Sequence, residues 1–187
     1  MQQQPLDYEQ SKLVSRQIAS TDACNEIIRK FDHNLVPVLQ KTDPEEALRQ
    51  GHVVEQTTYR SVLAQNININ DVPFLKDNVL SANSHLFKFN LYNDKIDCFF
   101  AKYEVGMHYA QLHIDCIAGP LQRKLSFSLM LNNEYVGGYF ELLQPPGPAS
   151  ETGKLLVFPS YLPHRVTPVT QGVRYVIFGW VYGPPYI

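Results

Sequence analysis

The amino-acid sequence predicts an α+β fold in which helices come first and short strands follow. Apolar residues recur with loose helical spacing over residues 13–39, and a helix-start pattern follows at 43–46. From residue 98 to residue 182, short apolar runs alternate with turn residues, as is typical of strands. Helices followed by many strands favour a domain whose strands roll into a barrel or a sandwich.

The composition is that of an ordinary globular protein. The 187 residues are 44% hydrophobic and 18% charged, and the formal net charge is -2 at pH 7. A domain of this size buries roughly 70% of its unfolded surface, which is enough for a sizeable core. Because the charge is nearly balanced, we expect neither nucleic acid nor an anionic membrane as a partner.

The cysteines and the apolar runs bear on the cellular compartment in which the protein is expected. Cys24, Cys98 and Cys116 are odd in number and scattered, which favours free thiols in a reducing compartment over a disulfide framework. The first residues are polar and uncharged, unlike a signal peptide, and no apolar run approaches the roughly 20 residues of a membrane span. We therefore expect a cytoplasmic protein without a membrane segment.

Residues 1–90 are expected to be mainly helical and to support the strands that follow. The run at 13–39 predicts a helix that ends near Pro37, because proline breaks a helix interior. At 43–46, an aspartate, a proline and two glutamates predict a second helix N-terminus. A third helix is expected over 74–86. Residues 66–70, in which asparagine and isoleucine alternate, fit either a strand or a loop.

The β core is expected over residues 98–182. The proline-rich stretch at 144–148 predicts a loop inside this region rather than a domain boundary, so we expect a single domain over 1–187. Strands are expected near residues 87–90, 98–105, 111–117, 124–132, 138–143, 154–158, 164–169 and 173–182.

A His-x-Asp pair and a distant histidine form a candidate metal site. His113 and Asp115 are two positions apart, so a strand would place both side chains on one face. His164, from a distant strand, would complete two histidines and one carboxylate, which is the usual facial ligand set of non-haem Fe(II) oxygenases. On spacing alone, a hydrogen-bonded His113–Asp115 pair without a metal is the alternative.

Arg174 is a candidate anion-binding residue. It lies in the apolar run 172–180, which predicts a buried strand. A buried guanidinium is costly unless it meets an anion. A dicarboxylate that chelates the metal at one end would supply that anion at the other, and a salt bridge to Glu134 or Glu141 is the alternative.

The C-terminal half of the chain resembles the Fe(II)/2-oxoglutarate-dependent dioxygenases. Within them it is similar to the prolyl 4-hydroxylase-like branch and its small bacterial and phage hydroxylases. The resemblance implies a double-stranded β-helix (jelly-roll) core with N-terminal buttressing helices. The pieces that carry it are Tyr103, Gly106, His113-x-Asp115, 123–126, 137–142, 153–160, 163–169 and 172–180.

The resemblance also implies the chemistry and its cofactors. These would be Fe(II), the cosubstrate 2-oxoglutarate and O2, with ascorbate as a supporting reductant. The reaction would hydroxylate a C–H bond and release succinate and CO2. By resemblance, Tyr103 and Val166 help to hold the cosubstrate beside Arg174. The implied catalytic set is His113, Asp115, His164 and Arg174, of which the first three bind the metal.

The substrate implied by the resemblance is a prolyl residue in a protein or peptide. A free amino acid or another small molecule is the alternative, and a non-catalytic metal-binding barrel is a more remote one. The segments 59–70 and 143–153 flank the expected core and could act as walls that close on the substrate. The pocket for that substrate would be lined by Tyr103, Tyr109, Phe140, Phe178 and Trp180.

Overall fold

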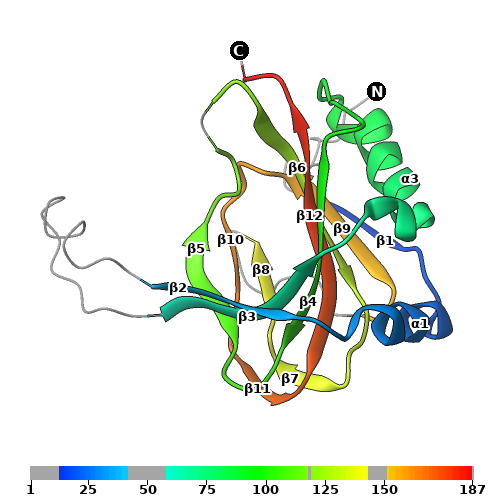
Figure 1. Ribbon diagram of the computed structural model, residues 1–187. Helices are drawn as coiled ribbons and strands as arrows, with labels where there is room; N and C mark the ends of the chain where they lie inside the picture. The colour runs from blue at the N-terminus through cyan, green and yellow to red at the C-terminus, as the bar shows by residue number, and fades with distance from the viewer. Residues whose placement is uncertain (1–12, 42–57, 118, 143–150, 187) are drawn as a thin grey trace, which may run out of the picture.

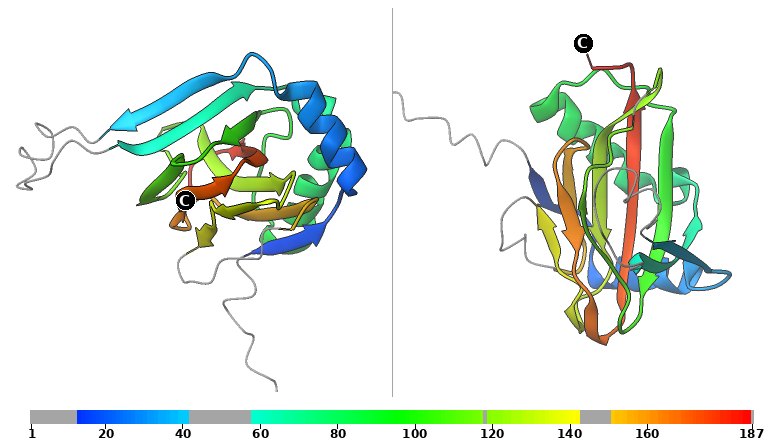
Figure 2. Two further views of the ribbon diagram at one scale, coloured as in Figure 1. Left: turned by 90° about the horizontal axis from the view of Figure 1, so that it is seen from below. Right: turned by 90° about the vertical axis from the view of Figure 1, so that its left-hand side faces the viewer.

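The computed structural model describes residues 13–41, 58–117, 119–142 and 151–186 (Figure 1). Within them, most strands join one 10-stranded antiparallel sheet that curls around a central space (Figure 2). Its strand order is β1-β9-β6-β12-β4-β3-β5-β10-β8, with β2 paired to β3, while β7 and β11 pair separately. The strands are β1 (Val14–Gln17), β2 (Val36–Lys41), β3 (Thr58–Asn66), β4 (Ile96–Tyr103), β5 (His108–His113), β6 (Gln122–Met130), β7 (Tyr135–Gly137), β8 (Phe140–Leu142), β9 (Lys154–Pro159), β10 (His164–Val166), β11 (Val169–Gly172) and β12 (Arg174–Gly183).

Two helices pack against one face of this sheet. Helix α1 (Thr21–Phe31) begins where the Ser20 side chain accepts a hydrogen bond from the Ala23 backbone N–H. Helix α3 (Pro73–Ala82) has proline in its first turn and continues into a π-helical turn at Asn83–Phe87. Their buried residues share one apolar cluster with β4, β6, β9 and β12.

Strand alternation divides the core into two apolar clusters. On β12, Ile177 and Val181 face the cluster under the helices, whereas Val176 belongs to a second cluster on the other face. The second cluster lies inside the curl of the sheet, between β12 and the strands β8 and β10. This arrangement matches the expected jelly-roll core. One sheet curls back on itself, and the same face of that sheet lines the interior from two directions.

The prediction that residues 1–90 are mainly helical was wrong in part. The stretch 13–39 holds β1, then α1, then most of β2, because Val14–Gln17 pairs with β9 and Val36–Lys41 pairs with β3. Pro37 lies in β2, whose single partner strand is β3 among the described residues. The helix expected to begin at 43–46 lies outside the described residues.

Residues 66–90 contain the predicted helix but not the predicted strand. The helix expected over 74–86 is present as α3 and the π-helical turn. Residues 66–70 are neither one strand nor one loop, because β3 ends at Asn66 and a 3-10 turn covers Ile69–Asp71. No strand occupies 87–90 in the described chain. The organisation of residues 1–187 as a single domain stays a prediction.

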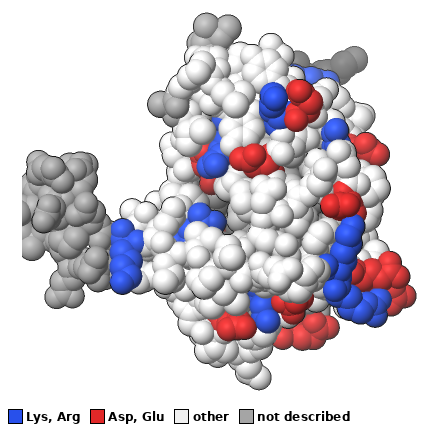
Figure 3. Space-filling model, in the orientation of Figure 1, with Lys and Arg blue, Asp and Glu red and all other residues white. Residues whose placement is uncertain are grey.

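The charges on the face seen in Figure 3 are mixed. Lysine and arginine lie beside aspartate and glutamate over this face, in keeping with a net charge near zero. In the segments that the structure describes, no helix is long and apolar enough to cross a membrane.

Candidate active site and metal centre

One pocket opens inside the curl of the sheet, and all ten residues singled out in the sequence line it. The structure brings these residues together in one pocket, while the role of each residue in binding or catalysis stays a prediction. The pocket also contains residues that the sequence did not single out, among them Arg60, Ser126 and Phe158. The ten are Tyr103, Tyr109, His113, Asp115, Phe140, His164, Val166, Arg174, Phe178 and Trp180.

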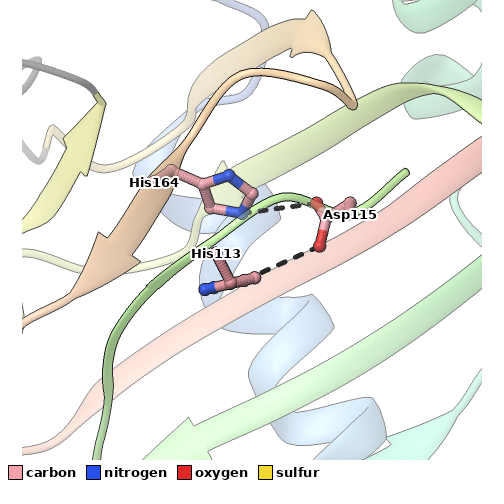
Figure 4. A group of neighbouring side chains, drawn as sticks. All are labelled: His113, Asp115 and His164. Atoms are coloured by element: carbon pink, nitrogen blue, oxygen red, sulfur yellow. Dashed lines mark ion pairs between the residues drawn. The ribbon is translucent and has the colours of Figure 1, made fainter. Parts of the chain in front are cut away.

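His113, Asp115 and His164 converge at one point of this pocket (Figure 4). The His113 Nε2 atom lies 3.7 Å from Asp115 Oδ1, and the His164 Nε2 atom lies 3.3 Å from Asp115 Oδ2. One potential ligand atom from each residue lies within 4.8 Å of the others. Two histidines and one carboxylate are the ligand set typical of non-haem Fe(II) sites, so the residues present fit an iron ion.

Strand pairing positions the two histidines, whereas backbone hydrogen bonds to Ser160 position Asp115. Strands β5 and β10 pair so that His113 lies opposite His164. Strand β5 ends at His113, so the expectation that Asp115 shares its strand was wrong. Instead, the backbone N–H groups of Asp115 and Cys116 donate to the Ser160 carbonyl at 2.9 and 3.0 Å.

Each histidine presents the same ring nitrogen to the metal position. His113 Nδ1 lies 2.9 Å from the Gln111 carbonyl, and His164 Nδ1 lies 2.9 Å from the Leu162 carbonyl. A carbonyl only accepts hydrogen bonds, so each Nδ1 carries the proton and each Nε2 keeps a free lone pair. This is the usual orientation of a metal-binding histidine.

Burial and neighbouring groups hold the site in its metal-binding protonation state. Burial alone would raise the pKa of Asp115, but neighbouring groups, among them the Ser126 hydroxyl that donates to this carboxylate, lower that pKa to about 2. Burial lowers the pKa of His113 below its ordinary value, and the neighbouring His164 lowers it further. Near neutral pH, Asp115 is therefore ionised and His113 is neutral.

These shifts predict how metal affinity depends on pH. A proton competes with the ion at His113 as the pH falls toward the lowered pKa of that residue, because a ligand histidine must be neutral. We expect the apparent Fe(II) affinity to stay constant from about pH 8 to pH 6.5 and to fall below about pH 6. Anaerobic titrations at several pH values measure this. An affinity that is flat down to pH 5 would contradict histidine ligation.

Arg174 is buried in the same pocket, and no described residue offers it an anionic partner. Its side chain is 2% exposed, and Nη2 contacts only the weak acceptor Met130 Sδ, at 3.6 Å. Among the described residues, its Nε and Nη1 atoms have no hydrogen-bond partner. Neither alternative salt bridge, to Glu134 or to Glu141, is formed in the described part of the chain, and Glu141 accepts from Arg165 at 2.6 Å instead. An unpaired buried guanidinium of this kind fits a carboxylate ligand.

The stem of Arg174 passes close to the turn at Gly138. This glycine has φ +59°, and a Cβ atom there would lie 3.1 Å from Arg174 Cδ and 2.9 Å from Val169 Cγ2. A side chain at this position would therefore crowd the arginine as well as strain the turn.

Aromatic side chains form the rest of the pocket wall. Tyr109 stacks on His113, with ring centroids 3.6 Å apart, and the Arg60 guanidinium lies 5.0 Å from the Tyr109 centroid. Phe178 and Trp180 meet edge to face at 5.5 Å. No sequence motif pointed to Arg60, which lies in β3, within the segment 59–70 that was expected to act as a wall closing on the substrate.

Comparison with known proteins places this pocket in a family. The model of the 2OG-Fe(II) oxygenase superfamily matches residues 98–182. A PKHD-type hydroxylase of Crocosphaera subtropica is 30% identical over 168 residues, which cover 80% of this chain and 76% of that protein. A PKHD-type hydroxylase of Synechococcus elongatus is 35% identical over 113 residues, which cover 53% of this chain and 49% of that protein.

Solved structures show that the fold is shared with two prolyl hydroxylases. A prolyl-4-hydroxylase of Pseudomonas putida superimposes with a TM-score of 0.68 at 20% identity and covers 96% of both chains. The viral collagen prolyl hydroxylase of Paramecium Bursaria Chlorella virus-1, solved with 2OG, has a TM-score of 0.67 at 13% identity. The match covers 93% of this chain and 97% of that one. The jelly-roll fold, the His-Asp-His cluster and the sequence relatives agree: this chain belongs to the 2OG-Fe(II) oxygenase superfamily.

Proposed function

We propose that this protein hydroxylates a C–H bond of a prolyl residue in a protein or peptide. His113, Asp115 and His164 would hold Fe(II), and Arg174 would bind the far carboxylate of 2-oxoglutarate. The observation that carries the cosubstrate assignment is the guanidinium of Arg174. It lies in the pocket that holds the ligand triad, and its Nε and Nη1 atoms have no partner among the described residues.

The bound iron, 2-oxoglutarate and O2 supply the oxidising chemistry, in which the cosubstrate becomes succinate and CO2 and one oxygen atom enters the substrate. The protein's own contribution is binding and orientation. His113, Asp115 and His164 would hold the ion and would leave room on it for cosubstrate and O2. The planar guanidinium of Arg174 suits a carboxylate in a two-bond fork.

The pocket wall favours an apolar group near the metal position. Arg174 and the Tyr103 ring lie together, with the guanidinium carbon 5.0 Å from the ring centroid. Tyr103 and Val166 would flank the cosubstrate. Tyr109, Phe140, Phe178 and Trp180 present aromatic surface that excludes water and suits a pyrrolidine ring.

Similar enzymes support a prolyl substrate. A structurally similar prolyl hydroxylase of Trichoplax adhaerens was solved with a peptide fragment of hypoxia inducible factor, at a TM-score of 0.64 and 18% identity. A free amino acid or other small molecule remains the alternative substrate. Most of the segment 59–70, which was expected to act as a wall closing on the substrate, is strand β3, paired with β4 and β5. Residues 143–150 lie outside the described residues.

Proline-containing peptides test the substrate assignment. With Fe(II), ascorbate and 2-oxoglutarate, the protein should add one oxygen to a proline in a peptide, as localised by fragmentation mass spectrometry. His164→Ala provides the negative control, because it removes a proposed iron ligand. Succinate formation that is stimulated only by free L-proline or another small molecule would overturn the peptide assignment and leave the oxygenase chemistry standing.

A further inference from the structure

We infer that Ser126, supported by Ser160, is a positioning residue that orients Asp115 for metal binding. The inference rests on the proposed function, because it takes Asp115 as an iron ligand. The starting observation is that the sheet does not place this carboxylate. His113 is the last residue of β5 and His164 begins β10, but Asp115 lies beyond the end of its strand.

Two hydrogen bonds hold Asp115 in place where strand pairing does not. The Ser160 carbonyl accepts the Asp115 backbone N–H at 2.9 Å and therefore fixes the backbone. The Ser126 hydroxyl donates to Asp115 Oδ2 at 2.7 Å and therefore fixes the side-chain rotation. The two serine hydroxyls lie 2.9 Å apart. Ser126 and Ser160 are 2% and 0% exposed, so water does not replace these contacts easily.

The donor and acceptor roles in this chain follow from the metal site. A carboxylate that binds a cation is deprotonated and only accepts hydrogen bonds. Ser126 therefore donates to Asp115, and its own oxygen accepts the hydroxyl proton of Ser160. The resulting chain, Ser160 to Ser126 to Asp115, points every O–H group toward the carboxylate.

The histidine ligands have equivalent supports of their own. Each Nδ1 atom donates to a carbonyl two residues earlier in the chain, at 2.9 Å. The hydrogen bond from Ser126 supports the Asp115 carboxylate in the same way as these carbonyl groups support the histidine rings. Such outer contacts typically change metal affinity by about 10- to 100-fold when they are removed.

The full-length chain and Mn(II) provide the test, with free Mn(II) measured by electron paramagnetic resonance. Ser126→Ala should weaken Mn(II) affinity by about 10- to 100-fold, and Ser126→Thr, which keeps the hydroxyl, should stay close to wild type. Ser160→Ala should give a smaller loss. Ser128→Ala is the matched control and should bind Mn(II) like wild type. Ser128 is also a buried serine on the same face of β6, but the described hydrogen bond to Asp115 comes from Ser126 and not from Ser128.

Each outcome of this experiment decides something. If Ser126→Ala and Ser160→Ala both bind Mn(II) as tightly as wild type, the two serines are structural and the inference is wrong. An equal loss in Ser128→Ala would also overturn it, since packing would then be the cause. Thermal unfolding of the metal-free variants separates lost stability from lost affinity, and Ser160→Ala keeps the test open if Ser126→Ala does not fold. If wild type itself binds no Mn(II), the proposed function fails instead.

Discussion

His164→Ala is expected to weaken Fe(II) binding by more than about 100-fold and to abolish 2-oxoglutarate turnover. This loss exceeds the one typically seen when a residue that only contacts a metal ligand is removed. His164 is 6% exposed, and its Nε2 atom faces Asp115 at 3.3 Å, so its removal takes away one of three ligands. No fourth residue belongs to this cluster in the part of the chain that the structure describes. The same result is expected for His113→Ala and Asp115→Ala. Anaerobic Fe(II) titration and succinate release measure the two effects.

The fold should survive these substitutions. The barrel is held by two apolar clusters, and none of the three ligands belongs to either. The far-ultraviolet circular dichroism of His164→Ala should therefore match that of wild type. His108→Ala is the matched control on strand β5, because His108 does not join the ligand cluster. Wild-type iron affinity in His164→Ala would remove that residue from the metal site.

Arg174→Ala is expected to weaken 2-oxoglutarate binding by roughly 3–5 kcal/mol, the usual effect of removing one partner from a buried charge pair. This corresponds to about 150- to 5000-fold in affinity. Arg174→Lys should lose less, because lysine keeps the charge but loses the two-bond fork. Iron affinity without cosubstrate should change little in both variants, since Arg174 is not among the clustered ligands.

A surface arginine supplies the control for this prediction. Arg165 pairs with Glu141, and its side chain is 45% exposed, so Arg165→Ala removes a cation without touching the pocket. Its 2-oxoglutarate affinity should equal that of wild type. An unchanged apparent affinity in Arg174→Ala would show that another group holds the far carboxylate.

The β core was predictable because its signals are local. Alternation along 172–180 placed Arg174, Phe178 and Trp180 on one face, and all three line the pocket. The His-x-Asp spacing identified the cluster, although Asp115 lies outside the strand. Its support by Ser126 depends on a contact between distant elements, which spacing does not reveal.

The N-terminal strands were missed for a related reason. Strand β1 pairs with β9, so Arg16 lies opposite Leu155, far away in the sequence. The mixture of strand and helix residues in 13–39 produces loose apolar spacing that imitates one helix. Burial in α1, by contrast, follows helical spacing at Cys24, Ile27 and Phe31, so this element was predictable within that stretch.

An anaerobic titration with Fe(II) and 2-oxoglutarate tests the central claim, that the ligand triad and Arg174 form one binding site. A visible charge-transfer band should appear only when both are present and should saturate at one Fe(II) per chain. His164→Ala should show no band, and Arg174→Ala should show it only at much higher 2-oxoglutarate concentrations. Absence of the band in wild type, or a wild-type band in both variants, would contradict the account.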